Sequence, residues 1–178
     1  MRHAIAAAVV AVFAIVFLHG GWLIRLLNPL FVRYLAAGLP AGPNVLLSVR
    51  GRSSGRPRRT PVAMLRVADR RFVQAAYGEV GWVRNLRAAG QAVVTQGRRT
   101  ETFGAVELPP DAAAALLRNA LAAYRPSQLL RRIVGPAARP PAGVLHYFGV
   151  RIDDTVDEYL ADATRHPLFE LLEPPASE

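Results

Sequence analysis

Short stretches of alternating apolar and polar residues dominate the middle of the chain. This two-residue period predicts β-strands, and turn residues such as Asp69-Arg70 and Gly97-Arg98 separate several of them. Because these turns are too short to hold a crossover helix, neighbouring strands are expected to pair as antiparallel hairpins. The predicted strands are residues 45–50, 60–67, 71–76, 91–96, 99–107 and 167–172, with residues 144–150 as a further extended segment.

Longer apolar spacings predict helices around these strands. Asn28 and Pro29 are typical of a helix start, Pro109-Pro110-Asp111 opens a second helix, and Gly90 is typical of a helix end. Hairpin-linked strands with helices outside them predict an α+β fold, an antiparallel β-barrel with peripheral helices. The predicted helices are residues 28–37, 82–89, 109–124 and 154–166, and the Pro- and Arg-rich residues 125–143 are expected to be irregular.

The N-terminus carries an apolar run from Ala4 to Leu18, which His19-Gly20-Gly21 interrupts. The run fits an uncleaved helix that spans or lies on a membrane, a helix that caps the barrel, or a cleaved signal peptide. No small-x-small cleavage motif follows it. We therefore divide the chain into an N-terminal apolar helix (residues 1–27), a barrel domain (28–172) and a loose tail (173–178).

The composition of the chain excludes several kinds of functional site. The chain has no Cys, which excludes a disulfide framework, a thiolate zinc site and a cysteine nucleophile. The formal net charge is +9, and residues 50–99 hold twelve Arg against only Asp69 and Glu79. From Asp153 to the end there are eight acids and one Arg. A basic middle followed by an acidic end favours a local anionic ligand over a general nucleic-acid surface.

The loop from Gly51 to Arg59 is the first candidate site. Its glycines permit close backbone approach, its Ser hydroxyls and backbone N–H groups can donate to phosphate oxygens, and its guanidinium groups match phosphate geometry. It lacks the Gly-Lys-Ser ending of a Walker loop. The alternative interpretation is a flexible basic hairpin with no ligand.

The second candidate site is the segment from Ala75 to Arg87, where a loop of small residues leads into a helix. Trp82 and Asn85 are three residues apart and share one helix face. The loop and the helix start can present backbone N–H groups to a planar ring. Alternatively, Trp82 is only a core residue and Asn85 only a local hydrogen-bonding group.

Together, the two segments carry a resemblance. The motifs Gly51-Arg52-x-Ser54-Gly55-x-Pro57-Arg58-x-Thr60-Pro61 and Trp82-Val83-x-Asn85-Leu86-Arg87 resemble the deazaflavin (coenzyme F-420)-dependent nitroreductase and quinone reductase family. The similarity extends over residues 25–172 and includes the Tyr77-Gly78-Glu79-Val80 loop and His166-Pro167-Leu168-Phe169. It implies a split β-barrel related to FMN-binding barrels. It also implies an oxidoreductase that uses F-420, rather than FMN, to reduce quinones, nitroaromatics or similar electron-poor acceptors.

The resemblance assigns roles to individual residues. Arg87 would support the ring-binding loop and the groove for the coenzyme's acidic tail, together with Trp82 and Asn85. Ser53 replaces a Lys that many members carry, and Arg56 or Arg59 would substitute for its charge. The loop between Gly78 and Trp82 is shorter than in the better-known nitroreductases. Arg52, Ser54, Gly55 and Arg58 would hold the phosphate and tail, Pro61 would shape the strand start beneath them, and Ala76, Tyr77 and Gly78 would line the ring.

In such an enzyme the coenzyme carries the hydride, and the protein supplies position and electrostatics. No metal-ligand spacing is visible, and Tyr124, Tyr147 and His146 are the candidates for a hydrogen bond to the acceptor. A cytosolic coenzyme and a lipid-soluble acceptor place the barrel in the cytoplasm, at the inner face of the membrane. The alternatives are a non-catalytic carrier of a flavin or deazaflavin, and a basic membrane-surface or nucleic-acid protein.

Overall fold

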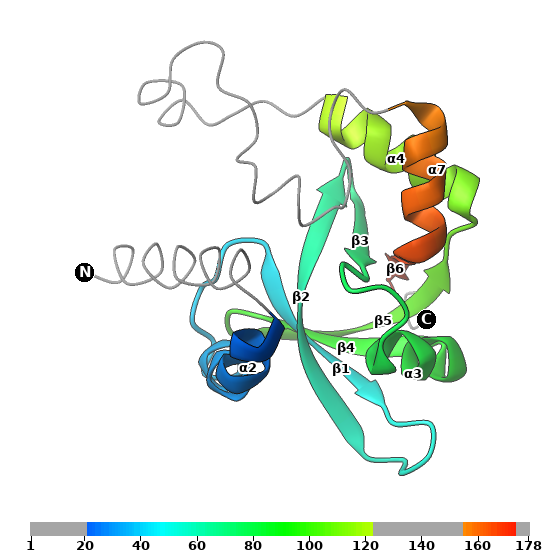
Figure 1. Ribbon diagram of the computed structural model, residues 1–178. Helices are drawn as coiled ribbons and strands as arrows, with labels where there is room; N and C mark the ends of the chain where they lie inside the picture. Colours follow the sequence, from blue (N-terminus) through cyan, green and yellow to red (C-terminus); the bar gives the residue numbers. More distant parts are fainter. Residues whose placement is uncertain (1–20, 123–154, 174–178) are drawn as a thin grey trace, which may run out of the picture.

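The computed structural model describes residues 21–122 and 155–173, and these residues form a barrel with helices around it (Figure 1). Six antiparallel strands close the barrel in the order β1-β2-β3-β6-β5-β4, with β4 pairing back onto β1. The strands are β1 (Asn44–Arg50), β2 (Pro57–Val67), β3 (Arg70–Gln74), β4 (Gln91–Gln96), β5 (Arg99–Glu107) and β6 (Leu168–Leu172). The helices are α2 (Gly21–Ala36), α3 (Gly81–Ala89), α4 (Pro110–Ala122) and α7 (Val156–Arg165).

Strand β2 is long because it serves two partners in succession. Its residues 57–63 pair with β1, and its residues 64–67 pair with β3. The strand therefore passes from one side of the barrel to the other, and the β1–β2 hairpin projects beyond the barrel beside α3 (Figure 1). Closure is completed by β6, which pairs with both β3 and β5.

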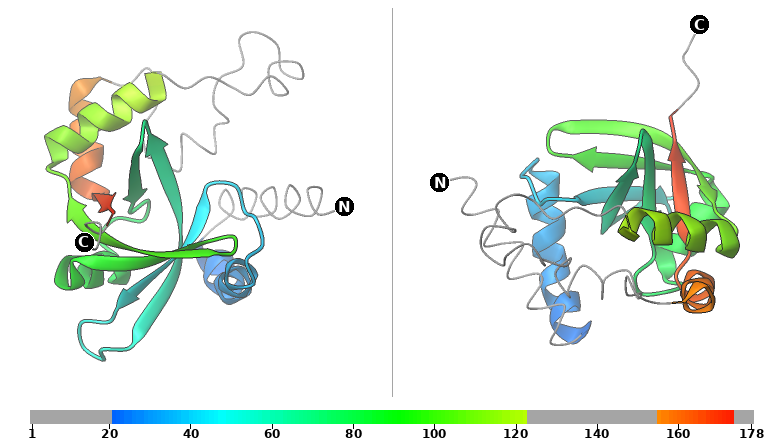
Figure 2. Two further views of the ribbon diagram at one scale, coloured as in Figure 1. Left: turned by 180° about the vertical axis from the view of Figure 1, so that it is seen from behind. Right: turned by 90° about the horizontal axis from the view of Figure 1, so that it is seen from above.

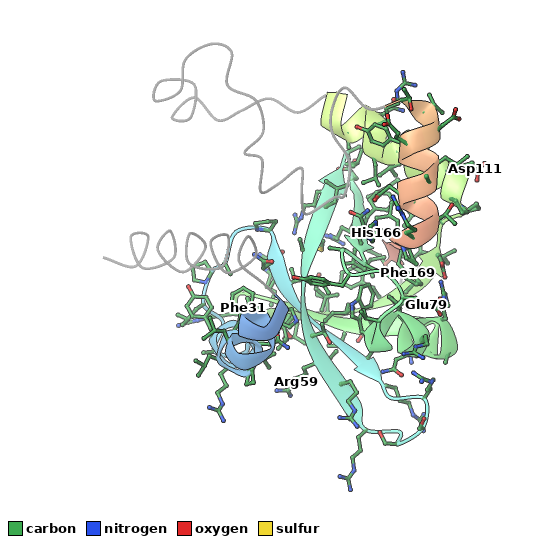
Figure 3. The ribbon with its side chains drawn as sticks, viewed as in Figure 1. Phe31, Arg59, Glu79, Asp111, His166 and Phe169 are labelled. Carbon is green, nitrogen blue, oxygen red and sulfur yellow. The ribbon has the colours of Figure 1, made fainter. Side chains whose placement is uncertain are left out.

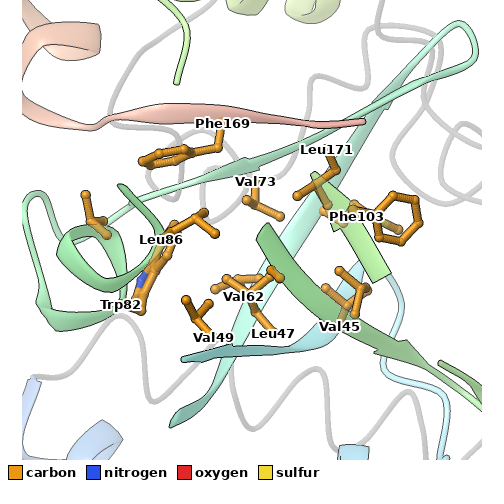
Figure 4. Close-up of a cluster of buried hydrophobic side chains, with 14 of the residues drawn as sticks. Val45, Leu47, Val49, Val62, Val73, Trp82, Leu86, Phe103, Phe169 and Leu171 are labelled. Carbon is orange, nitrogen blue, oxygen red and sulfur yellow. The ribbon is translucent and has the colours of Figure 1, made fainter. Parts of the chain in front are cut away.

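The barrel interior is filled by alternate residues of each strand. Val45, Leu47 and Val49 of β1 point inward and are at most 1% exposed, as the two-residue period of the sequence predicts. Helix α3 closes one end, where Trp82 and Leu86 enter the same apolar cluster (Figure 4). The barrel therefore has a filled core and not a channel.

Two further apolar clusters attach the helices to the outside of the barrel. Helix α2 packs on β1, where Phe31 and Leu35 bury Leu46. Helices α4 and α7 lie on the other side, over β3 and β6, where Tyr159 and Leu117 bury Phe72 (Figure 2). Helix α7 begins at a capping box, in which Thr155 and Glu158 each satisfy the other's backbone N–H.

The strands agree with the sequence-based predictions to within a few residues, and Gly90 ends α3 in the left-handed conformation with φ +63°. The prediction of a helix start at Asn28-Pro29 is wrong. Pro29 lies inside α2, so the predicted boundary between residues 27 and 28 falls within a helix. A Pro removes only one intrahelical hydrogen bond, and packing of the following turns against β1 stabilises the helix beyond it.

Several predicted segments lie outside the described residues. These are the apolar run Ala4–Leu18, the irregular residues 125–143 and the extended residues 144–150. In the part of the chain that the structure does describe, no helix is long and apolar enough to cross a membrane.

Candidate functional site

The loop that joins β1 to β2 is a tight turn and not an open basic hairpin. Gly51 N donates to Arg56 O at 2.9 Å, and Gly55 N donates to Gly51 O at 2.8 Å. Gly55 has φ +64°, which favours Gly. A Cβ on Gly51 would lie 2.9 Å from Ser54 Oγ and 3.0 Å from Arg56 O, so a side chain at residue 51 would force the turn apart.

A single amide fixes this loop against α3. Arg52 donates twice to Asn85 Oδ1, from its backbone N at 3.3 Å and from its Nη1 at 3.2 Å. Asn85 is only 8% exposed, and its position on the inner face of α3 follows from the spacing with Trp82 and Leu86. The structure therefore brings together two site residues that are 33 positions apart in the sequence.

The arginines of this region have no carboxylate partner in the described part of the chain. Within the described residues, no ion pair forms at any of the five arginines from the last residue of β1 to the third residue of β2, which are Arg50, Arg52, Arg56, Arg58 and Arg59. All five are exposed. Unneutralised guanidinium groups in a fixed turn repel one another, and an anion that binds among them relieves this repulsion. Ser53 and Ser54 are exposed in the same turn.

The loop from Ala75 to Val80, between β3 and α3, is fixed by the segment that follows α7. Ala75 N donates to Pro167 O at 2.9 Å, and Gly78 N donates to Ala75 O at 2.8 Å. Gly78 has φ +70°, and a Cβ there would lie 3.2 Å from Arg165 O. Figure 3 shows Glu79 and His166 on the same side of the barrel, where this loop meets the start of β6.

Arg87 supports this loop through ion pairs. Its guanidinium donates to Glu107 at the end of β5 and to Glu79 in the loop, the latter at 2.8 Å. The hydrogen bonds that Arg87 donates to Glu107, together with the negative charge of both carboxylates, raise the pKa of Arg87 further above its ordinary value. Arg87 therefore joins α3 to the Ala75–Val80 loop and to the end of β5, and two carboxylates neutralise its charge.

Two other predicted site residues, Trp82 and Pro61, have structural positions in the core and in β2. Trp82 is 8% exposed and lies 5.9 Å from Phe169, ring centre to ring centre, so it is a core residue that seats α3. Pro61 does not shape a strand start, because β2 begins at Pro57 and Pro61 lies within the strand opposite Leu46. The neighbouring hydrogen bonds place it at a non-hydrogen-bonded position of the β1–β2 ladder, where a missing N–H costs nothing.

The start of α3 adds unused backbone donors. No side chain caps the helix at Val80. Among the described residues, the N–H groups of Gly81 and Trp82 have no hydrogen-bond partner, so they remain available to a carbonyl or an anion. Ala76 and the exposed Tyr77 lie in the loop just before this helix end.

Some functional residues were not predicted, and others lie outside the described part of the chain. Glu107 was missed because it pairs with Arg87 only after β4 and β5 fold back, 20 residues along the chain. Tyr124, Tyr147 and His146, the candidates for acceptor contacts, are not among the described residues. No group of three potential metal ligands occurs within the described ranges.

The sequence profile of the F420H(2)-dependent quinone reductase family matches residues 32–132, more than half of the chain. The chain belongs to this family. It is therefore an F-420-dependent oxidoreductase, and coenzyme F-420 is its cofactor. The matched residues include both the loop that holds Arg52 and the helix that holds Asn85.

Solved structures add a likeness of fold only. One is titled as the structure of an F420-H2-dependent reductase (FDR-A), with 17% sequence identity and a TM-score of 0.41 over 72% of this chain and 93% of that one. Another is titled as a putative 5-nitroimidazole antibiotic resistance protein from Bacteroides thetaiotaomicron, with 9% identity and a TM-score of 0.44 over 81% and 78%. Among curated proteins, none matches the chain.

The conformation of Gly78 can be tested against a matched glycine three residues away. We expect Gly78→Ala to lower the free energy of unfolding by about 1–2 kcal/mol, because Ala at φ +70° is strained and crowds Arg165 O. Gly81→Ala is the control, since a Cβ there meets nothing within 4 Å. Urea unfolding of both variants measures the difference, and equal stabilities would show that the loop does not require Gly78.

Proposed function

We propose that the β1–β2 loop, α3 and the Ala75–Val80 loop together form the seat for reduced F-420, and that the enzyme passes hydride from it to a quinone. The observation that carries this proposal is the pair of hydrogen bonds from Arg52 to Asn85. It joins a cationic turn, suited to an anionic tail, to the helix whose start adjoins the small-residue loop.

The cationic turn fits the charged end of the coenzyme. F-420 carries a phosphate and glutamate carboxylates, and the exposed guanidinium groups of Arg52 and Arg58 have no ion pair within the described residues. Arg58 lies opposite Val49, on the strand face that α3 covers. Arg56 and Arg59 supply further charge, which is consistent with the absence of Lys at Ser53. Gly55, Ser54 and Ser53 complete the turn as phosphate donors.

The ring end of the coenzyme fits the Ala75–Val80 loop. Ala76 and Gly78 present little side chain, Tyr77 offers an exposed ring, and the N–H groups at the start of α3 suit ring carbonyl oxygens. The loop is fixed by Arg87 through Glu79 and by the hydrogen bond from Ala75 N to Pro167 O, so it needs little rearrangement on binding. The six-stranded antiparallel barrel is consistent with the split barrel that the family resemblance implies.

The protein's role in the reaction is to bind and orient. When bound, reduced F-420 supplies the hydride. The chain's own residues fix the coenzyme tail through Arg52 and Arg58 and restrict the ring to one orientation, which lowers the entropic cost of reaching the reactive geometry. A quinone is the acceptor that we infer from the family, and no described side chain is needed as a nucleophile or a metal ligand.

The first functional prediction concerns the contacts of Arg52 and Arg58 with the acidic tail of the coenzyme. We expect Arg52→Ala and Arg58→Ala each to weaken binding of oxidised F-420 by about tenfold or more, since a charge-assisted hydrogen bond contributes ~1.5–3 kcal/mol. Fluorescence titration measures the affinity, and Arg118→Ala, an exposed Arg on α4, is the control. Unchanged affinity in both loop variants would place the tail elsewhere.

Variants of Asn85 test whether Arg52 has to be held in position or contributes only its charge. Asn85→Ala removes the acceptor for both Arg52 donors without changing the charge, and we expect it to weaken F-420 binding by about three- to tenfold. Asn85→Asp retains an acceptor oxygen and should recover part of the binding. Circular dichroism checks that both variants fold. Equal binding by the wild-type and Asn85→Ala proteins would show that Arg52 does not need this contact.

Turnover tests the acceptor and the assignment of hydride chemistry to the coenzyme. We expect reduced F-420 to be oxidised when menadione is added, and Tyr124→Phe, Tyr147→Phe and His146→Gln each to lower the rate by less than tenfold. A general acid would instead contribute ~10²–10⁴-fold. F-420 binding without turnover of any quinone or nitroaromatic would indicate a carrier rather than a reductase.

A further inference from the structure

The end of the barrel opposite α3 is hollow. The β1–β2 pairing stops at Asn44 and Ala63, while β2 continues to Val67 with β3 as its partner. In the same direction β4 and β5 run on to their turn at Gly97-Arg98. The two hairpins β2–β3 and β4–β5 enclose a cavity of about 100 Å³, which we call the distal mouth.

The floor of the distal mouth is apolar. It consists of Met64 from the first hairpin and Val94 and Phe103 from the second, which are 6%, 4% and 2% exposed. All three belong to the core cluster that fills the barrel. Figure 4 shows Phe103 at one end of this cluster and Trp82 at the other, so the distal mouth and the α3 site lie at opposite ends.

The rim of the distal mouth is polar and mostly cationic. Arg66, Arg71 and Arg99 line it, against one carboxylate, that of Glu101. Arg66 has only a neutral partner, Gln96 Oε1 at 2.8 Å, and neither Arg66 nor Arg99 forms an ion pair with any described residue. Glu101 and the Arg71–Glu173 ion pair offset part of this charge, so the cavity combines a rim of net positive charge with an apolar floor.

The two sides of the mouth are braced against each other. The Arg66–Gln96 hydrogen bond crosses from β2 to β4. Arg71 on β3 lies over the ring of Phe103 on β5, with its guanidinium carbon 5.1 Å from the ring centre, and also donates to Glu173 Oε1 at 2.6 Å. These contacts hold the hairpins at a fixed separation, so the cavity exists before any ligand enters.

We propose that the distal mouth binds a small organic anion, a carboxylate with a short alkyl tail. The carboxylate lies between Arg66 and Arg99, and the tail covers Met64 and Phe103. The size follows from the volume, because about 100 Å³ is less than the ~150 Å³ of an apolar cavity that binds benzene, so the carboxylate and the first carbons of the tail fill the cavity. A deazaflavin is far too large for this cavity. The site is therefore separate from the coenzyme seat and does not depend on the proposed function.

Binding of simple carboxylates to the full-length protein tests this site. We expect hexanoate to bind with millimolar or better affinity, acetate at least about tenfold more weakly because it leaves the floor uncovered, and hexylammonium not at all. Amide chemical shifts should move at Val94, Gln96 and Phe103. Calorimetry gives the affinities, and the same shifts should be absent at Arg52 and Asn85.

Three variants separate a built site from general positive charge. We expect Arg66→Gln and Arg99→Gln each to weaken hexanoate binding by about tenfold. Arg118→Gln on α4 removes the same charge elsewhere and should leave binding unchanged. F-420 binding should be retained in all three, which checks the fold. Equal loss in Arg118→Gln, equal affinity for acetate and hexanoate, or binding of hexylammonium would each overturn the proposal.

Discussion

The seating of α3 in the end of the barrel is the contact on which the remaining site geometry depends. Trp82 and Leu86 complete the core, and the same helix carries Asn85 to one loop and Arg87 to the other. The helix is only nine residues long, too short to be stable alone, so burial of its apolar face determines where its polar residues lie. The packing of the core therefore also determines the geometry of the proposed coenzyme site.

The sequence predicted the strands well because each has a strong local signal, the two-residue period bounded by turn residues. The family resemblance assigned Arg52 and Asn85 to one predicted site, and in the structure the two residues are hydrogen-bonded. The sequence did not predict the Arg87–Glu107 pair or the crossing of β2, since both depend on which strands become neighbours after folding. The helix start at Asn28 failed for the same reason, because packing against β1 overrides the local signal of Pro29.

Arginine in this chain serves two distinct purposes, and the presence of acidic neighbours distinguishes them. Arg70 and Arg87 lie on strands or helices beside Glu170, Glu79 and Glu107, where they join elements that are distant in sequence. The arginines of the β1–β2 loop and Arg66 and Arg99 of the distal mouth have no such neighbours in the described part of the chain. Composition alone gives no way to separate the two groups.

The two ends of the barrel consequently differ in how they are closed. At one end a helix fills the opening, and binding has to take place on the outside, along fixed loops. At the other end none of the described helices enters, and the Arg66–Gln96 and Arg71–Phe103 contacts cross the opening. Within the described residues, both ends carry guanidinium groups without acidic partners, but only at the distal mouth do these groups line a cavity whose floor consists of core residues. An anion with an apolar tail matches both the guanidinium groups and the apolar floor of the distal mouth. A larger phosphorylated coenzyme matches only the guanidinium groups.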